Sequence, residues 1–395
     1  MEKFSQNPTE IAGPTELLNR EFEHRHIVEY HQLVQESYLK NFVTAGYEKI
    51  QPVDIASSYD KSTIFIGSSI STFKPMLEDY KIPECGAVVV QPCMRTQNKK
   101  NLYNDEVVPE YNSYFNIIGG IAPLNKTEDV CNHFTDYLRN DLNIDPSCLT
   151  IKINRDDMDL LQGVSNLGDI KIEMNTREPK YYRWIYGMEG ISGRGLTYSV
   201  KNFNSGTNGD IGNIIIMDKG GKSVAVQWGF GVETILSRVF GKKYPIESSL
   251  IGQACFPKFE TLIKFQDTLA SVLEMFISKV KPGVHSAGCE QRDYLKGLSY
   301  LRRKFDITLE DVQECANKYL KLKGIIDQGA VEEMITYIVQ HEKKVAQFSE
   351  IVLDLKKTSS TADVLKILEN QAQRIAWTRQ YHVNILEMKK IILSI

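Results

Sequence analysis

Motifs that would hold a metal ion are missing from this sequence. It contains no Cys-x-x-Cys pair, no His-x-x-x-His motif and no His-Glu-x-x-His motif, so no zinc site is expected. The seven cysteines are an odd number without paired spacing, which is typical of free thiols in a reducing cytosol.

Long apolar runs and a secretion signal are missing as well. No stretch of about 18 apolar residues occurs, so we expect no membrane span and no membrane partner. The N-terminal MEKFSQNPTEIAGPTE lacks the basic-then-apolar pattern of a signal peptide. These absences together predict a cytoplasmic protein.

A large excess of charge of one sign is also lacking. Lysine and arginine number 47 against 50 acidic residues, for a net charge of −3. This balance excludes a general polycation, and we expect no DNA partner, although a local basic face remains compatible with it. The 395 residues suit two or three domains, and an apolar content of 42% is sufficient for a substantial core.

The first part of the chain has α+β patterning. Residues 1–27 are a polar lead-in, and a helix is predicted over 28–42, stopped near Gly46. Short β-branched runs bounded by turn residues then predict strands at 62–69, 85–94, 147–153, 212–217 and 222–228, with a helical stretch at 127–142 between them. Because regular βαβ alternation is missing, the sheet should be mostly antiparallel, with helices flanking it.

After about Tyr244 the pattern becomes helical. Helices are predicted over 257–280, 287–304, 308–323, 329–355 and 362–392, with Thr308 and Thr361 as N-caps. In the last of these, His382 lies on the apolar stripe, where a core-edge histidine is expected rather than a ligand. The predicted organisation is therefore a lead-in (1–27), an α+β domain (28–243) and an all-helical domain (244–395).

A first group of candidate site residues surrounds Arg95. This residue ends the apolar strand AVVVQPCMR, a polar stretch follows, and the strand YFNIIGG (114–120) comes next, which predicts a long β-hairpin. Arg95 could clamp a phosphate, Lys99 and Lys100 on the mobile tip could neutralise outer phosphates, and Phe115 could stack on a base. Taken alone, the same pattern also fits a solvated strand end.

A second group lies between residues 210 and 233. Asp210 and Asn213 open one strand, and SVAVQWGFGVETILSRVF predicts a second strand, a glycine-rich turn and a helix. Gly229 and Gly231 would let a ligand approach the backbone closely, and two carboxylates, Asp210 and Glu233, could hold Mg²⁺.

The order of these segments resembles the catalytic domain of class II aminoacyl-tRNA synthetases, in particular the alanyl-tRNA synthetase family. Helix 28–44 with STIFIGSSISTFKP (62–75) is similar to motif 1, and QPCMRTQNKKN (91–101) through YFNIIGG is similar to motif 2. WIYGMEGISGRG (184–195) resembles the amino-acid pocket segment, and DIGNIIIM (210–217) with WGFGVE (228–233) resembles motif 3. Residues 283–303 resemble the family's first tRNA-recognition helix.

The resemblance implies a class II synthetase-like fold, ATP and Mg²⁺ as cofactors, and formation of an aminoacyl-adenylate. It implies that Arg95 holds the α-phosphate and the substrate carboxylate, that Phe115 stacks on adenine and that Asp210 helps to place Mg²⁺. Lys99, Lys100, Gly229, Gly231 and Glu233 complete the implied ATP site. Trp184, Asn213, Gln227 and Gly229 form the implied pocket for alanine or a related small amino acid.

The implied contact to RNA lies on the helix 287–304. Arg292, Lys296 and Arg303 fall on one face of that helix, with Arg302 beside them, where they could bind a phosphate backbone such as a tRNA acceptor stem. A solvated basic face is the alternative interpretation of these residues.

Departures from the family pattern keep a second hypothesis open. Thr234 replaces the ATP-binding arginine of motif 3, and neutral Gln227 replaces the aspartate that binds the substrate ammonium. The first hypothesis is a ligase that activates a small amino acid and transfers it to tRNA, a carrier protein or a small molecule. The alternative is a catalytically degenerate paralogue that binds or regulates, and a third is an amide ligase that uses a non-amino carboxylate.

Overall fold

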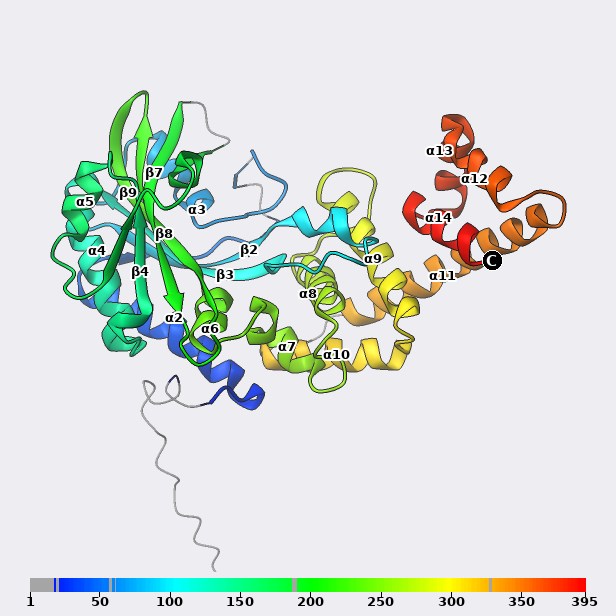
Figure 1. Cartoon of the computed structure of the whole chain (residues 1–395), viewed down its shortest axis with the longest axis horizontal. Coiled ribbons are helices and arrows are strands. Elements are labelled where there is room, and N and C mark those ends of the chain that lie inside the picture. Colours follow the sequence, from blue (N-terminus) through cyan, green and yellow to red (C-terminus); the bar gives the residue numbers. More distant parts are fainter. Residues whose placement is uncertain (1–17, 19–20, 57–58, 61, 187–189, 327–328) are drawn as a thin grey trace, which may run out of the picture. The chain divides into compact units, whose positions relative to one another are not determined.

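The computed structural model describes residues 18, 21–56, 59–60, 62–186, 190–326 and 329–395 (Figure 1). The chain forms two compact units. The first comprises Met1–Pro52, Thr72–Gln91 and Asn116–Lys243, and the second comprises Val53–Ser71, Pro92–Phe115 and Tyr244–Ile395. Most of the predicted lead-in lies outside the described residues. Two segments that the sequence analysis assigned to the α+β domain, 53–71 and 92–115, are grouped with the helical unit.

The sheet is mixed but mostly antiparallel, as predicted. Its strands are β1 (Glu48–Lys49), β2 (Ala87–Met94), β3 (Tyr114–Pro123), β4 (Leu149–Ile153), β5 (Lys171–Met174), β6 (Arg183–Ile185), β7 (Ile191–Lys201), β8 (Asn208–Lys219) and β9 (Lys222–Gly231). The order is β1-β2-β3-β9-β8-β7-β4-β5, and β6 pairs with β7. The two short pairs β1–β2 and β4–β5 are parallel, whereas the long central pairs are antiparallel. The predicted hairpin strands β2 and β3 are neighbours in this order.

The helices are divided between the flanks of the sheet and the helical region. They are α2 (Ile27–Thr44), α3 (Ile70–Glu78), α4 (Thr127–Asp136), α5 (Met158–Val164), α6 (Val232–Val239), α7 (Leu250–Cys255), α8 (Ile263–Ile277), α9 (Ser286–Lys304), α10 (Leu309–Leu322), α11 (Ala330–Lys356), α12 (Thr361–Glu369), α13 (Gln371–Tyr381) and α14 (Ile385–Ser394). None of the helices formed by described residues is long and apolar enough to cross a membrane.

One face of the sheet packs on helices α2 and α4 through aromatic side chains. Trp228 on β9 is fully buried and donates a hydrogen bond from Nε1 to the Tyr38 hydroxyl at 2.8 Å. Phe230, two residues further, stacks on Phe134 of α4 with ring centroids 3.7 Å apart. Side chains alternate between the two faces of a strand, so Gln227, Gly229 and Gly231 belong to the opposite face.

The helical unit has its core around α8, which is buried over almost its whole length. Residues of α7, α9, α10 and the first half of α11 join α8 in this cluster. A second, smaller cluster holds α12–α14 against the end of α11, with Phe348 packed on Trp377 and Tyr381.

The predicted single helix 362–392 is wrong, because the chain breaks twice there. Asn370 has an extended backbone and its side chain caps the next helix by accepting from Gln373 N. His382 has a left-handed backbone with φ 55° and ends α13, so it is exposed and is not on a continuous apolar stripe. The cap of α12 is Ser360 rather than Thr361, whereas Thr308 forms a full capping box with Asp311 as predicted.

The predicted strand at 62–69 is also absent from the described residues of that segment. The segment instead makes single backbone contacts, such as Ile66 N to Ile55 O at 2.8 Å and Met94 N to Ile66 O at 2.8 Å. Ile66 is buried in this loop whereas Ile64 is exposed, so tertiary contacts outweigh local β-propensity here.

The packing of Trp228 predicts that Gly120→Ala will be destabilising. A methyl group at Gly120 would lie 2.1 Å from Cζ2 of the Trp228 ring, so the buried ring must move. We expect a loss of about 1–3 kcal/mol in the free energy of unfolding, measured by urea titration. The control is Gly163→Ala in α5, where the nearest side-chain atom would be 3.5 Å away. That change should be neutral or slightly stabilising, because alanine favours helix. Equal stability of the two variants would contradict the packing argument.

Candidate functional site

A row of residues crosses the open face of the sheet in the first unit. Lys152 on β4 is paired with Thr197 on β7, Thr197 with Asn213 on β8, and Asn213 with Gly229 on β9. Gly229 is in turn opposite Gly119 on β3. Directly opposite residues point to the same face, so this row combines polar side chains at one end with two glycines at the other. It brings together Asn213 and Gly229, both predicted from the sequence.

Within the row, Asn213 has a free donor group. Thr197 Oγ1 donates to Asn213 Oδ1 at 2.7 Å, which fixes the orientation of the amide. No partner of Asn213 Nδ2 occurs among the described residues, so this nitrogen can donate to a ligand oxygen above Gly229. Gly229 is half-buried and Gly119 is buried, and neither carries a side chain that would keep a ligand away from the backbone.

Asp210 is held at one end of the row by three protein donors. Lys152 Nζ and Ser199 Oγ donate to Oδ1, and the Tyr181 hydroxyl donates to Oδ2, each at 2.6 Å. Burial alone raises the pKa of Asp210, but hydrogen bonds from Lys152, Ser199 and Tyr181 outweigh this and the pKa is lowered. Asp210 is therefore a carboxylate whose charge is balanced by the buried Lys152.

The second predicted magnesium ligand, Glu233, also has protein partners. The backbone N and the Nδ2 of Asn116 donate to its two carboxylate oxygens at 2.9 and 3.0 Å. No cluster of three or more His, Cys, Asp or Glu side chains suited to a metal is present in the part of the chain that the structure describes. Protein donors contact both oxygens of each carboxylate, and the magnesium role of Asp210 and Glu233 stays a prediction.

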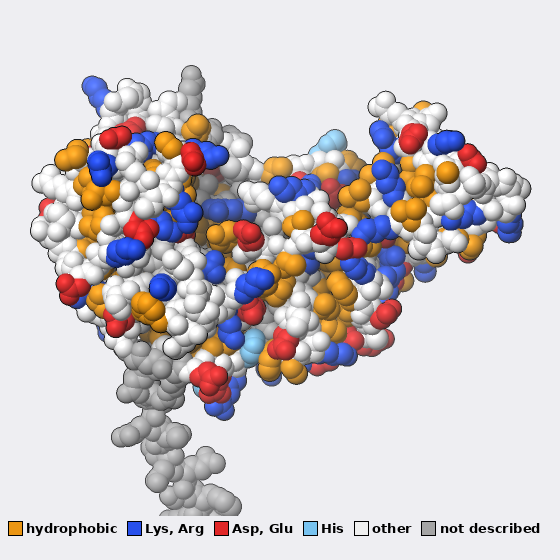
Figure 2. Space-filling view, viewed as in Figure 1, with side chains coloured by type: hydrophobic (Ala, Val, Ile, Leu, Met, Phe, Trp, Pro, Cys, Tyr) orange, Lys and Arg blue, Asp and Glu red, His pale blue; other side chains and the backbone are white. Residues whose placement is uncertain are grey.

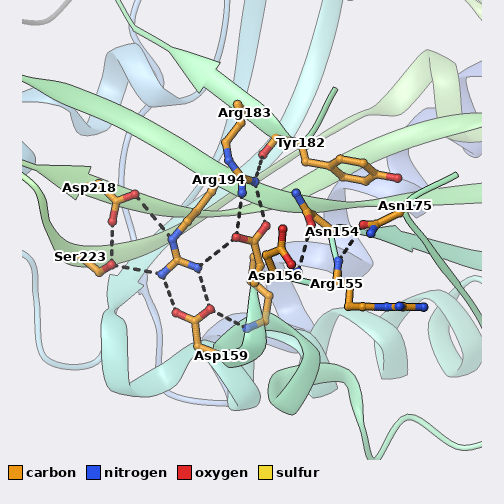
Figure 3. Close-up of polar contacts among 12 residues, drawn as sticks. Asn154, Arg155, Asp156, Asp159, Asn175, Tyr182, Arg183, Arg194, Asp218 and Ser223 are labelled. Carbon is orange, nitrogen blue, oxygen red and sulfur yellow. Dashed lines mark hydrogen bonds and ion pairs between the residues drawn. The ribbon is translucent and has the colours of Figure 1, made fainter. Parts of the chain in front are cut away.

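The strand that carries Trp184 is fixed by a network of arginines and aspartates (Figure 3). Trp184 is half-buried on β6, opposite Gly193 of β7. Next to it, Arg183 forms a bidentate pair with Asp157, with distances of 2.8 and 3.0 Å.

The same network continues along β7. Arg194 forms a second bidentate pair with Asp159, with both distances 2.6 Å, and its Nη2 also donates to Ser223 Oγ at 3.2 Å. The hydrogen bond from Arg194 lowers the pKa of Asp159, in spite of partial burial. The sequence analysis did not find these pairs, because nothing in the spacing of the aspartates indicated two arginine partners.

Two further residues of the first unit bear on the predicted amino-acid pocket. The Tyr186 hydroxyl is buried and has no hydrogen-bond partner among the residues described. Burial raises the pKa of Tyr186, so the group stays a neutral donor and acceptor. Gln227 is buried and donates from Nε2 to its neighbour's carbonyl, Trp228 O, at 2.6 Å. Residues 187–189 of the predicted pocket segment lie outside the described residues.

Thr234 and Arg238 lie on α6. Thr234 is half-buried beside Gly231. Arg238 packs against Gly209 and donates from Nη1 to Lys243 O at 3.4 Å, so its guanidinium is directed along the helix toward that carbonyl. The structure therefore gives Arg238 a different neighbourhood from that of the missing motif 3 cation.

In the second unit, Arg95 and Phe115 come together. The Arg95 guanidinium lies over the Phe115 ring, 5.0 Å from its centroid, and Arg95 Nε donates to Gly67 O at 2.7 Å. Arg95 N donates to Ser113 O at 2.8 Å, which continues the pairing of the predicted hairpin. The arginine is exposed, so its remaining nitrogens are accessible to an anion.

The loop between these two residues is anchored rather than mobile, which corrects the prediction of a mobile tip. Asp267 of α8 accepts from Ser113 N at 2.6 Å, Ser113 Oγ at 2.7 Å and Asn98 Nδ2 at 2.9 Å. Lys99 Nζ is paired with Glu290 of α9 at 2.7 Å, while Lys100 is exposed. Burial lowers the pKa of Lys99, but the contacts with Glu290 outweigh this and raise it.

The four cations predicted to contact RNA have different environments. Arg302 is bound to Glu342 at 2.8 Å through Nε, and Arg303 is paired with Glu387. Arg292 contacts Cys289 Sγ at 3.2 Å and Asp293 at 3.4 Å through Nη2. Lys296 is buried on the same helix. The structure therefore does not leave all four on one free face.

No family model matches this sequence, and no curated protein matches it. Similar solved structures include a protein described as a threonyl-tRNA synthetase from Aeropyrum pernix, at TM-score 0.39 and 11% identity, covering 63% of this chain and 69% of that one. Another is the asparaginyl-tRNA synthetase of Entamoeba histolytica in complex with asparaginyl-adenylate, at TM-score 0.38 and 10% identity, covering 62% and 71%. The corresponding complex from Pyrococcus horikoshii has TM-score 0.33 and 9% identity, covering 57% and 68%. At TM-scores below 0.5, function must be argued from the residues of this chain.

The paired Lys152 and Asp210 predict a pH-dependent loss of stability in Lys152→Met. Removing the ammonium leaves a largely buried carboxylate without its charge partner, which should cost about 2 kcal/mol near pH 7, measured by urea unfolding. The pKa of Asp210 is lowered in the folded state, so its contribution is present above the unfolded pKa and is lost as pH falls through the folded pKa. The difference from wild type should therefore shrink in acid.

The matched control is Lys171→Met, which breaks the exposed pair with Glu173. A surface pair contributes at most about 1 kcal/mol, so this variant should change little. An equal loss in both variants, or a loss that is independent of pH, would contradict the role assigned to Lys152.

Proposed function

We propose that this chain is a class II synthetase-like ligase that activates a small amino acid, alanine or a relative, as an aminoacyl-adenylate. The observation that carries the proposal is the row Lys152, Thr197, Asn213, Gly229 and Gly119 on the open face of the sheet. The sequence resemblance assigned Asn213 and Gly229 to the amino-acid pocket, and their direct cross-strand pairing supports that assignment.

The row suits a small substrate with a carboxylate. Asn213 Nδ2 is a free neutral donor, and the glycines opposite and beside it leave room for the substrate backbone. Trp184 and Tyr186 would form a wall of the pocket, held by the pairs of Arg183 and Arg194 (Figure 3). Gln227 offers a neutral amide where the family has a carboxylate, so the ammonium group would be recognised by neutral contacts alone.

ATP would bind through the Arg95 and Phe115 pair. The accessible guanidinium would hold the α-phosphate, and the face of the Phe115 ring would stack on adenine. A carboxylate oxygen of the substrate attacks the α-phosphorus, the bond to the bridging oxygen breaks and pyrophosphate leaves. Arg95 stabilises the charge that develops on the α-phosphate, and no side chain acts as a nucleophile.

Mg²⁺ would enter as part of the ATP complex, and Asp210 would help to place it while it keeps its contact with Lys152. In a second step, a nucleophilic group of an acceptor attacks the carbonyl carbon of the adenylate and AMP leaves. A tRNA acceptor stem, a carrier protein and a small molecule are the candidate acceptors.

One observation favours the alternative of a degenerate paralogue that binds or regulates. Thr234 leaves the motif 3 position without a cation, and Arg238 is directed to Lys243 O instead. Amino-acid-dependent pyrophosphate–ATP exchange over a panel of amino and hydroxy acids separates the hypotheses. Exchange with any acid supports the ligase, whereas ATP binding without exchange for every acid supports the paralogue.

Arg95→Ala should reduce exchange by about 10²–10³, because the only cation assigned to the α-phosphate is removed. The control is Arg155→Ala, which removes an exposed arginine outside the proposed site. The initial rate of exchange at saturating ATP is the measurement, with the substrate acid found in the panel. Retention of most of the activity in Arg95→Ala would show that the ATP site has been assigned to the wrong residues.

Thr234→Arg should raise the affinity for ATP. The residue is half-buried at the start of α6, next to Gly231, so a longer side chain can extend from this position. A charged hydrogen bond to a phosphate contributes about 1.5–3 kcal/mol, or roughly 10- to 150-fold in affinity.

Calorimetric titration with ATP and Mg²⁺ measures this change. The matched control is Thr358→Arg in the exposed turn after α11, which adds the same charge elsewhere and should leave the affinity unchanged. Unchanged or weaker binding by Thr234→Arg would mean that phosphate does not lie near the start of α6.

A further inference from the structure

A pocket in the helical unit gathers cationic side chains from segments far apart in the sequence. Its volume is about 540 Å³, and it lies between the short helix η2 (Thr96–Asn101) and helices α9, α13 and α14. Its lining holds a single carboxylate, Asp293, and six cations: Lys99, Lys100, Arg292, Lys296, Arg374 and Arg379. Lysine, arginine and hydrophobic side chains lie together on the face over α13 and α14 (Figure 2).

Lys296 is the residue that points to a ligand. Its exposed fraction is 8%, and no ion pair or hydrogen bond to its ammonium occurs among the described residues. Burial and then the neighbouring Arg292 lower the pKa of Lys296. The stem of Lys296 is therefore buried while its ammonium, without a protein partner among the described residues, faces the pocket, where an anionic group would compensate its charge.

The other cations leave the charge of the pocket largely uncompensated. Asp293 is shared between Lys99 at 3.5 Å and Arg292 at 3.4 Å. The Nε of Arg292 is buried and has no hydrogen-bond partner among the described residues. Glu290 adds one more carboxylate that pairs with Lys99, whereas Asp293 and Glu387 act on Lys296 by charge without forming an ion pair with it. Positive charge therefore converges on this pocket.

The pattern of ion pairs on α9 favours a small ligand over an RNA backbone. An RNA backbone is best bound by a run of free cations along a surface. Here Arg302 and Arg303, one turn and more beyond the pocket, are bound to Glu342 and Glu387. The free cations are thus confined to the pocket and do not continue along the helix.

We propose that this pocket binds a small phosphorylated molecule that carries two or more phosphate groups. The phosphates would contact Lys296 and Arg292 at the buried end and Arg379 at the rim. Two exposed apolar side chains of the rim, Ile375 and Leu386, would contact an organic group on the ligand. The volume is in the usual range for small-molecule sites, about 300–1,000 Å³. Lys99 and Lys100, which the sequence resemblance placed at the ATP phosphates, line this pocket, whereas Arg95 and Phe115 do not.

Tripolyphosphate is the probe for the test, and isothermal titration of the full chain in low salt is the measurement. We expect binding to the wild type, at least tenfold weaker binding to Lys296→Met, and near wild-type binding to the matched control Lys318→Met on the surface of α10. Tripolyphosphate should also raise the melting temperature of the wild type and not that of Lys296→Met. Without ligand, Lys296→Met should be at least as stable as wild type, because it loses an unpaired buried charge.

Arg95→Ala separates this site from the proposed ATP site. It should lose pyrophosphate exchange and keep tripolyphosphate binding, so the failure of one proposal is distinguishable from the failure of the other. Three results would overturn the proposed phosphate site. These are no binding of tripolyphosphate to the wild type, binding that is lost in Arg95→Ala but kept in Lys296→Met, and a loss of binding in Lys318→Met as large as that in Lys296→Met. Unfractionated tRNA that binds more tightly than tripolyphosphate, in a manner that depends on Lys296, would overturn the assignment to a small molecule in favour of RNA.

Discussion

The alternation of side chains along β9 is the constraint on which the first unit depends. Trp228 and Phe230 pack on Tyr38 and Phe134, so their positions are fixed by the largest aromatic contacts of that core. A shift of one residue would move Trp228 and Phe230 to the opposite face of the sheet. Gln227 and Gly229 must therefore lie on the face opposite to this aromatic core. The core thus sets the register that places Gly229 opposite Asn213.

Much of this arrangement could be predicted from the sequence, because it depends on local pattern. The β-branched runs identified β8 and β9, and the polar or glycine positions within them identified Asn213 and Gly229. Lys152 could not be found in this way. It is 58 residues from Asp210, and only the pairing of β4 with β7 brings the two together. The two breaks in the C-terminal helices could not be predicted either. The pattern of 362–392 is that of one amphipathic helix, but Asn370 adopts an extended backbone and His382 a left-handed one.

The loop from Arg95 to Ser113 shows a different limit of sequence interpretation. Its polar composition predicts a mobile hairpin tip, whereas the fold holds it through the buried carboxylate of Asp267. Burial raises the pKa of Asp267, and the donors Ser113 and Asn98 offset this only in part. Local polarity does not show whether the partner of a polar group is water or a distant helix. Here the partner is α8, and the consequence is that Arg95 extends from a fixed base.

Under the proposed function, the charges of the sheet row bear directly on substrate choice. The family's negative charge for the ammonium is absent at Gln227, and the remaining carboxylate, Asp210, is balanced by Lys152. The row therefore presents neutral donors and acceptors together with one compensated ion pair. A neutral hydrogen bond is roughly half as strong as a charge-assisted one, so an ammonium group gains less here than in a pocket with a free carboxylate. A site of this kind should distinguish substrates more by size, through Trp184 and the two glycines, than by the charge of the amino group. The proposed function therefore predicts that hydroxy acids and β-amino acids would be substrates beside alanine.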